Sequence, residues 1–533
     1  MPKVEILRAT RASLFHFIYY LMLVKTYGSA VYGIRAITVT VEVNVSTGIR
    51  YFLVGLPDSA VKESQHRIQS ALHSNGLKWP GKQIVINMAP ADVRKEGSLY
   101  DLTIAIGILA ASEQLPSANL GRYMIMGELS LDGGLQPIKG ALPIALQARE
   151  AGFEGIILPK KNALEAAVVE GLKVYGADNL REVVAFVSTG NTLPETRVDV
   201  KGLFMSKMNR YPFDFADVRG QETVKRALEI AASGGHNVLM IGSPGAGKTM
   251  LAKRLPTILP PLSLDEAIET TKIHSVAGKI GDTTSLMTCR PFRSPHHTIS
   301  DVALVGGGTY PQPGEISLAH NGVLFLDELP EFKRQVLEVL RQPLEDREIS
   351  ISRAKFTVKY PASFMLVASM NPCPCGYYNH PTKACVCTTG MIQKYLSKIS
   401  GPLLDRIDMH IEVIPVEFDK LAGARPAETS EMIRERVILA RDIQAQRYAS
   451  YPGIHSNAQI SRKMIEKFCR IDEQGQQLLK NAMEKRGLSA RAYDRILKVA
   501  RTIADLEGSE NIQNNHLAEA IQYRSLDREG WGG

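Results

Sequence analysis

The octapeptide GSPGAGKT at residues 242–249 constrains this chain more than any other feature. It fits the pattern GxxxxGKT, the apolar stretch HNVLMI precedes it, and a helical pattern follows it. In a strand, loop and helix of this kind, the glycines let backbone N–H groups surround phosphate oxygens at the helix N-terminus. The motif therefore predicts a P-loop α/β domain that binds ATP with Mg²⁺.

Each residue of the loop has an expected part in nucleotide binding. We expect Lys248 to contact the β- and γ-phosphates and the Thr249 hydroxyl to bind Mg²⁺. The predicted ATP-binding set is Gly242, Ser243, Pro244, Gly245, Ala246, Gly247, Lys248 and Thr249.

Two further apolar stretches end in polar residues. The segment NGVLFLDELPEF predicts a strand over 323–326 that leads into Asp327, a second magnesium ligand, and Glu328, which would polarise the attacking water. FMLVASMNP predicts another strand that ends at Asn371, whose amide would orient that water. Each also has a plain structural reading, as a solvated acidic turn or as a strand-terminal asparagine.

In their order along the chain, GSPGAGKT, VLFLDE, ASMNP and GPLLDRID resemble an AAA+ ATPase of the magnesium-chelatase-like branch. The strings VRGQETVKRALEIAASGGHNVLMIG, RPFRSPHHTISDVALVGGG and NPCPCGY resemble the YifB/ComM family, over Met22 to about Arg524. This family pattern more often has Pro at position 243, a difference that the loop should tolerate because its backbone binds the phosphates. The resemblance implies a homo-oligomeric ring, a hexamer by family analogy.

The resemblance also implies two catalytic arginines. Arg406, in LLDRID, matches the arginine finger that one protomer directs at the γ-phosphate held by its neighbour. Arg491, in LSARAYDRIL, matches the sensor-2 position. The alternative for both residues is an ordinary arginine on a helix surface.

The patterns divide the chain into five segments. We expect an N-terminal extension (1–21), an α/β domain (22–188), a linker (189–212), an AAA+ α/β core (213–415) and a helical lid (416–533). In the second segment, ITVTVEVNVS alternates, which predicts a strand with Ile37, Val39, Val41, Val43 and Val45 on one buried face. Further strands are expected at 83–88, 123–129 and 155–159, and a helix is expected to follow Asp58.

This α/β segment resembles the Lon-protease-like domain, through RKEGSLYDLTIAIGIL and GELSLDGGLQPIKGALPIALQA. Lon proteolysis needs a serine nucleophile and a lysine base. Leu99 stands at the serine position, and Ala141, Leu142 and Pro143 stand where Lon has its lysine. We therefore expect the fold without the protease chemistry.

Residues 14–24 (LFHFIYYLMLV) follow Lys3, Arg8 and Arg11, so they imitate a secretory signal. The stretch is too short to span a bilayer, and a nucleotide-dependent enzyme follows it. We expect a dispensable extension, a cytoplasmic protein and no membrane partner.

Four of the six cysteines, Cys373, Cys375, Cys385 and Cys387, form two C-x-C pairs. Four soft ligands in one loop could hold Zn²⁺, although the usual spacing is C-x₂-C. Reduced structural thiols and redox chemistry are the alternatives. Six cysteines in 533 residues are too few for a disulfide scaffold.

The net charge and the basic residues of the chain bear on whether the ATPase binds DNA. The formal net charge of +8 is compatible with DNA but does not require it. EISISRAKFTVKYPAS (348–363) predicts a hairpin with Lys355 and Lys359 on or near its tip, where they could contact phosphates or be solvated. The next DNA-contact candidates are Arg290, Arg293, His296 and His297.

Three classes of function remain at this point. The resemblance implies a ring motor on DNA, for branch migration or helicase activity in recombination or natural transformation. A magnesium-chelatase-type ATPase subunit, which remodels a metal-insertion partner, is the alternative. A protease of Lon type is disfavoured by Leu99.

Overall fold

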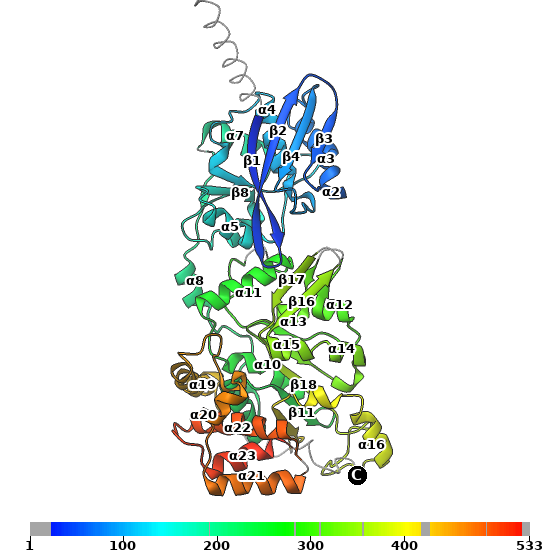
Figure 1. Ribbon diagram of the computed structural model, residues 1–533, viewed down its shortest axis with the longest axis vertical. Helices are drawn as coiled ribbons and strands as arrows, with labels where there is room; N and C mark the ends of the chain where they lie inside the picture. Colours follow the sequence, from blue (N-terminus) through cyan, green and yellow to red (C-terminus); the bar gives the residue numbers. More distant parts are fainter. Residues whose placement is uncertain are drawn as a thin grey trace, which may run out of the picture. The chain divides into compact units, whose positions relative to one another are not determined.

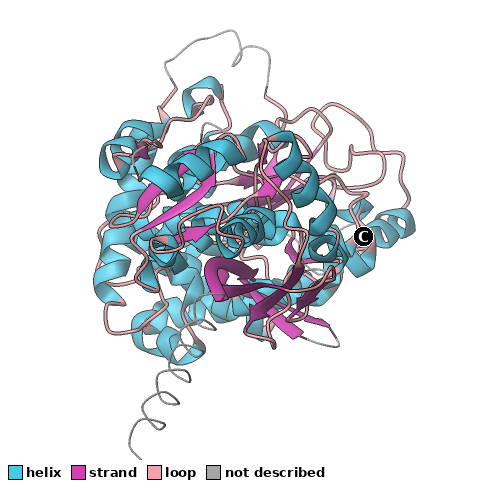
Figure 2. Ribbon diagram, turned by 90° about the horizontal axis from the view of Figure 1, so that it is seen from above, coloured by secondary structure: helices cyan, strands magenta, loops and turns pink. Residues whose placement is uncertain are grey.

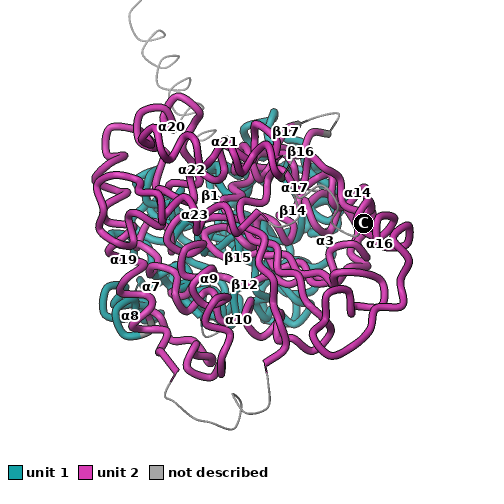
Figure 3. The backbone as a smooth tube through the Cα atoms, turned by 90° about the horizontal axis from the view of Figure 1, so that it is seen from below, with its two compact units in different colours: residues 1–206, 268–287 teal, residues 207–267, 288–533 magenta. Residues whose placement is uncertain are grey.

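The computed structural model describes residues 23–524 except 191, 282–283, 309–310, 354–355, 417–426 and 487. The chain divides into two compact units (Figure 3): one ends at Ser206 and also contains Ile268–Met287, and the other comprises Lys207–Ala267 and Thr288 onward. Both units mix helices and strands. Figure 2 shows the helices and strands of the chain, which confirm the α/β class. Within the described residues, no helix has both the length and the apolarity that crossing a bilayer requires. The predicted extension, 1–21, lies outside them.

The first unit is built on an eight-stranded mixed sheet of order β10-β9-β8-β5-β1-β2-β4-β3. Its longest strands, β1 (Leu23–Tyr32) and β2 (Arg35–Ser46), pair as an antiparallel ribbon (Figure 1). The other strands are β3 (Tyr51–Val54), β4 (Gln83–Ala89), β5 (Tyr123–Ile125), β8 (Gly155–Pro159), β9 (Lys173–Ala177) and β10 (Glu195–Thr196). The helices are α2 (Ser59–Lys62), α3 (Ser64–Ser74), α4 (Asp101–Ala111), α5 (Ala141–Glu150), α6 (Lys160–Ala166), α7 (Leu180–Thr189) and α8 (Val200–Lys207).

The alternation in β2 is confirmed except at one end. Val39, Val41, Val43 and Val45 are buried, as predicted. Ile37 is 37% exposed, so its placement on the buried face was wrong. It lies near the turn of the β1–β2 ribbon, where the burial alternation changes phase.

Two other expectations for this unit were wrong. The single strand expected over 123–129 is interrupted after Ile125, because the backbone of Gly127 pairs with Leu99 and Leu102 instead of with a strand. Its second half is β6 (Glu128–Leu129), which pairs with β7 (Leu135–Gln136) in a separate sheet. The segment 189–212, expected to be an irregular linker, contains β10 and α8.

The second unit contains a five-stranded parallel sheet of order β12-β15-β18-β11-β19. Its strands are β11 (Val238–Gly242), β12 (Phe292–Arg293), β15 (Val323–Leu326), β18 (Met365–Met370) and β19 (Met409–Val413). Every residue of β11, β15 and β18 is buried, as continuous apolar strands in a parallel sheet require. The loops that follow these three strands therefore meet at one edge of the sheet.

Helices surround this sheet and complete the unit. They are α9 (Glu222–Gly234), α10 (Lys248–Ile258), α12 (Asp301–Val305), α13 (Glu315–Leu318), α14 (Arg334–Glu338), α15 (Arg341–Asp346), α16 (Thr389–Leu396) and α17 (Gly401–Leu404). α11 (Leu264–Val276) has residues in both units. Two short strands, β13 (Gly306–Gly307) and β14 (Gln312–Pro313), form a ribbon, and β16 (Glu348–Arg353) pairs with β17 (Phe356–Pro361) as the predicted hairpin.

The described residues after β19 contain helices, as predicted: α19 (Ser430–Arg447), α20 (Arg462–Phe468), α21 (Glu473–Arg486), α22 (Ala490–Leu506) and α23 (Asn514–Gln522). Their apolar residues share one buried cluster with the sheet, to which Val238, Val367, Val437, Ile496 and Leu517 all belong. The sheet and these helices therefore share a continuous core. The predicted boundaries at 188, 212 and 415 stay predictions.

Candidate nucleotide-binding site

The predicted phosphate loop lies between β11 and α10. Gly245 and Gly247 have φ angles of +80° and +90°, in the left-handed region that favours glycine. At Gly242 a Cβ atom would lie 2.3 Å from the Val413 carbonyl oxygen of β19, so a side chain there would displace the neighbouring strand. Gly242, Gly245 and Gly247 therefore occupy positions of the phosphate loop at which a larger residue would be strained or would clash.

Lys248 is the first residue of α10 and is 9% exposed. Its Nζ donates to the carbonyl oxygens of Gly242 at 2.7 Å and Ser243 at 3.0 Å, and to Asn371 Oδ1 at 3.2 Å. Burial lowers the pKa of this ammonium group, and the carboxylates of Asp327 and Glu328 oppose that shift. The Lys248 ammonium group thus links the loop after β11 to Asn371, which follows β18.

Thr249 and Asp327 meet at the same edge. Thr249 Oγ1 donates to Asp327 Oδ2 at 2.8 Å, and the backbone N–H of Glu328 donates to Asp327 Oδ1 at 3.1 Å. The Ser369 hydroxyl, from β18, donates to the same carboxylate oxygen. A hydroxyl and a carboxylate at this distance are oxygen donors of the kind that Mg²⁺ prefers, so these residues fit the ion.

Glu328 follows Asp327 with a φ of +54°, a conformation that non-glycine residues adopt mainly where their surroundings impose it. Its side chain is 58% exposed, and His297 Nδ1 lies 3.6 Å from its Oε2. Sequence reasoning missed this proximity, since it considered His297 only as a DNA contact. It also missed Ser369, whose only signal was a hydroxyl in an otherwise apolar strand.

Arg406 lies at the other edge of the sheet. Because β11 and β19 are parallel, with Val238 opposite Met409, a residue before Met409 lies at the amino ends of the strands. Asn237, the residue before β11, confirms this by donating from its side chain to the Arg406 carbonyl oxygen at 3.2 Å. The phosphate loop follows the carboxyl end of β11, about 13 Å further along the strand. The fold therefore separates Arg406 from the phosphate loop of its own subunit.

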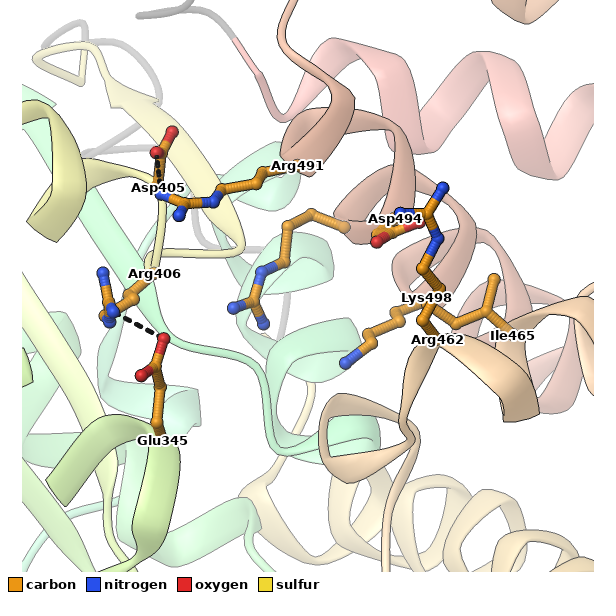
Figure 4. A pocket seen from close by; sticks show the side chains of 9 residues that line it. Glu345, Asp405, Arg406, Arg462, Ile465, Arg491, Asp494 and Lys498 are labelled. Atoms are coloured by element: carbon orange, nitrogen blue, oxygen red, sulfur yellow. Dashed lines mark hydrogen bonds and ion pairs between the residues drawn. The ribbon is translucent and has the colours of Figure 1, made fainter. Parts of the chain in front are cut away.

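The two predicted catalytic arginines line one pocket (Figure 4). Arg406 pairs with Glu345 of α15 at 2.5 Å, and Arg491 of α22 pairs with Asp405 at 2.7 Å. The remaining lining residues are Arg462, Ile465, Asp494, Arg495 and Lys498. Five basic and three acidic side chains thus face this pocket, an excess of positive charge that suits an anion.

Buried charges hold the wall of this pocket in place. Arg495 pairs with Asp408 at 2.7 Å, and it keeps the pKa of that buried carboxyl well below its usual range against the effect of burial. Burial, with the repulsion of Arg495, lowers the pKa of Lys498 to about 8. Arg495 and Lys498 belong to α22, and Asp408 directly precedes β19. The pairing therefore ties the helical region to the segment that carries Arg406.

The four clustered cysteines follow β18 and Asn371. They are unpaired as disulfides, and their sulfur atoms all lie within 4.8 Å of one another. Of the two hairpin lysines, Lys355 lies outside the described residues. Lys359 is on β17 opposite Ser350 and donates to Glu348 at 2.6 Å, so it lies along the strand and not at the tip.

The other DNA-contact candidates have partners within the unit. Arg290 donates to the Asn321 carbonyl oxygen at 2.7 Å, and Arg293 forms a two-pronged pair with Glu315. The ring of His296 lies against that of His297, with centroids 4.1 Å apart. In the first unit, Ala141, Leu142 and Pro143, which stand where the predicted Lon-like pattern would have its lysine, are buried in α5.

Three family models match the chain. The model for magnesium chelatase, subunit ChlI, matches residues 214–421, the model for its C-terminal part matches 427–524, and a further model for subunit ChlI of Mg-chelatase matches 41–162. The first two cover the sheet, the site and the helical region described above. The third lies within the first unit.

Two curated relatives match over most of the chain, and a third matches over a smaller part. Competence protein ComM from Haemophilus influenzae is 46% identical over 94% of this chain and 97% of its own length. YifB from Escherichia coli, whose role is uncharacterised, is 44% identical over 94% of this chain and 96% of its own. The magnesium-chelatase 38 kDa subunit from Cereibacter sphaeroides is 26% identical over only 30% of this chain and 53% of its own.

Proposed function

The chain belongs to the YifB/ComM family of magnesium-chelatase-like AAA+ ATPases, and from this premise we propose that it is an ATP-hydrolysing ring motor that acts on DNA. The observation that carries the ATPase assignment is the meeting of Lys248, Thr249, Asp327 and Asn371 at the carboxyl edge of the parallel sheet. Its cofactors would be ATP and Mg²⁺. We place the reaction in the cytoplasm.

The hydrolytic step would divide among the residues of this edge. Lys248 and the loop N–H groups would neutralise the phosphates, and Thr249 with Asp327 would hold the magnesium ion, which would supply positive charge to the phosphates. Glu328 accepts a hydrogen bond from the attacking water and so raises its nucleophilicity. Asn371, which Lys248 holds by its amide oxygen, orients the same water.

A ring supplies what one subunit lacks. Arg406 is at the opposite edge from the phosphate loop of its own subunit, so it can serve a nucleotide only across a subunit boundary. Arg491 shares its pocket, and we therefore assign both arginines to the nucleotide of a neighbouring subunit. We infer a closed homo-oligomeric ring, with six subunits by family analogy.

DNA is the proposed substrate of the motor. The support is the relative named a competence protein, the net charge of +8 and the β16–β17 hairpin. In this role, ATP hydrolysis would drive branch migration or strand separation during recombination, as natural transformation requires. The four clustered cysteines have no step in this reaction.

A magnesium-chelatase-type subunit is the second candidate, because family models named for that enzyme match much of the chain. Its weakness is coverage, since the curated magnesium-chelatase subunit spans 30% of this chain whereas ComM spans 94%.

One experiment separates the two candidates. The ATPase rate of the full-length protein is measured alone and with single-stranded, duplex and forked DNA, and branch migration is followed on a labelled three-strand junction. We expect DNA to raise the rate and wild type, but not Glu328→Gln, to move the junction. An ATPase that no DNA stimulates and that moves no junction would favour the chelatase-type role.

A further inference from the structure

The segment between β18 and α16, residues 371–388, contains neither helix nor strand. Much of it faces solvent: residues 381–384 are exposed, and Val386 is 81% exposed. Loops of this length without regular structure are uncommon in compact domains, and this one buries little apolar surface that could fix its course. A cross-link would explain how the segment keeps a defined path.

The cysteines supply the atoms for such a link. The Sγ atoms of Cys373 and Cys375 are 3.3 Å apart, those of Cys373 and Cys385 are 3.7 Å apart, and those of Cys375 and Cys385 are 3.6 Å apart. A disulfide needs about 2.05 Å between sulfurs. Four thiolates around zinc, each about 2.3 Å from the ion, lie about 3.8 Å from one another. The observed spacing therefore suits a shared metal ion better than a disulfide.

We propose that Cys373, Cys375, Cys385 and Cys387 form a structural Zn²⁺ site. All four sulfurs lie within 4.8 Å of one another, so a single ion can reach every one. Four sulfur donors in a tetrahedron are characteristic of zinc or of iron bound by thiolates. Binding converts four thiols and Zn²⁺ into a tetrathiolate complex of charge −2 and releases four protons.

The surroundings stabilise that charge. The backbone N–H of Tyr378 donates to the Cys373 sulfur at 3.3 Å, as backbone amides do around metal-bound thiolates. Gly376 has a φ of +83° and makes the turn after the first C-x-C pair possible. Its N–H donates to the Cys373 carbonyl oxygen at 3.0 Å. Lys383, in the same loop, lies over the Tyr377 ring at 4.8 Å and adds a positive charge.

The site would also brace the nucleotide-binding edge. Cys373 is two residues after Asn371, which accepts the hydrogen bond from Lys248. A Cβ atom on Gly376 would lie 2.6 Å from Cδ of Pro244, so the cysteine loop packs directly against the phosphate loop. The ion thus serves as a positioning element for Asn371 and Pro244 and touches no reacting atom.

The test is metal content, measured without ATP or DNA and hence independent of the proposed function. Full-length protein purified without chelators or a metal-affinity step is analysed by mass spectrometry for zinc and iron. We expect about one zinc per chain in the wild type and in the control Cys289→Ser, whose cysteine lies outside the cluster. In Cys385→Ser/Cys387→Ser we expect fewer than roughly one chain in ten to keep zinc.

A second measurement tests the proposal on the wild type, in case the double variant does not fold. A mercurial thiol reagent added to wild type should release the zinc in step with modification of the cluster thiols, and trypsin should then cut after Lys383 faster than before. Purified wild type with four reactive thiols and no metal would overturn the proposal. Stoichiometric iron in place of zinc, or full zinc content in the double variant, would overturn it as well.

Discussion

At the scale of single residues, the proposed roles separate nucleotide binding from hydrolysis. Lys248 is surrounded by three oxygen acceptors and belongs to the loop itself. Glu328 is more than half exposed and follows Asp327, the proposed magnesium ligand, instead of lying within the loop. Substitutions of these two residues should therefore fail at different steps.

We expect Lys248→Ala to abolish measurable nucleotide binding, since it removes the charge that partners the phosphates. Glu328→Gln should bind ATP about as well as wild type but hydrolyse it roughly 10²- to 10⁴-fold more slowly, because the water loses its base. Binding of a fluorescent ATP analogue and steady-state ATPase rates check both. Equal hydrolysis by wild type and Glu328→Gln would refute the role of Glu328.

His297 gives a prediction that the sequence did not contain. Its ring nitrogen faces the Glu328 carboxylate at 3.6 Å, whereas His296 donates to or accepts from Thr298 at 2.9 Å. We expect His297→Ala to lower kcat several-fold with little change in KM, because a neighbour that positions the base is lost. The matched variant His296→Ala should keep both constants. A pair of variants with identical kinetics would exclude the positioning role.

At the scale of elements, the β16–β17 hairpin carries the DNA prediction. Lys359 is held by Glu348, which raises the pKa of the lysine and offsets its charge. We expect Lys355→Ala to weaken DNA binding and to flatten its logarithmic salt dependence by about one unit. Lys359→Ala should change DNA binding less, because the ammonium group of Lys359 is already paired with the Glu348 carboxylate and is less available to a phosphate.

Glu348→Gln is the matched control for the hairpin. It removes the carboxylate and frees the charge of Lys359, so we expect tighter DNA binding with a steeper salt dependence. Fluorescence anisotropy at several salt concentrations measures all three variants, with ATP affinity as the check on folding. Unchanged affinity and slope in all of them would place the DNA contact elsewhere.

Regular elements with strong patterns were predictable from the sequence. The helix after Asp58 begins where the aspartate accepts from the Val61 N–H at 2.8 Å, although it is interrupted at Glu63. The apolar strands before Asp327 and Asn371 are in the sheet, at neighbouring positions. Such elements are encoded locally, by burial and capping, and local patterns are what a sequence displays.

Elements that depend on tertiary partners were not predictable. α8 was missed because it is short and contains Gly202, although a local cap is present, in which Asp199 accepts from the Gly202 N–H at 2.9 Å. The bend at Gly127 exists because Leu99 and Leu102 take its backbone hydrogen bonds. The meeting of Arg406 and Arg491 needs the fold of the whole second unit, since 85 positions separate them.

At the scale of the whole molecule, the parallel sheet would make each subunit of the proposed ring incomplete. The phosphate loop follows the carboxyl end of β11, and Arg406 precedes the amino end of β19. One subunit therefore offers a nucleotide at one edge and an arginine at the other. A ring in which these edges meet would contain complete sites only between subunits.

This geometry makes a complementation experiment decisive. Arg406→Ala should keep nucleotide affinity near that of wild type, because the residue is remote from the loop of its own subunit, while turnover falls roughly 10³- to 10⁵-fold. Lys248→Ala should also be inactive, but because it does not bind nucleotide. When the two variants are mixed before assembly, some interfaces pair an intact phosphate loop with an intact Arg406, so ATPase activity should reappear.

The expected activity of the mixture depends on composition. It should be highest near equal amounts of the two variants and vanish at either pure end, because a complete interface needs one subunit of each kind. Glu328→Gln mixed with Lys248→Ala is the control, since both defects lie at the same edge of the sheet, and no interface of that mixture combines an intact loop with an intact base. Activity restored only in the Arg406→Ala mixture would support action across the boundary. The absence of rescue at every ratio would count against that action.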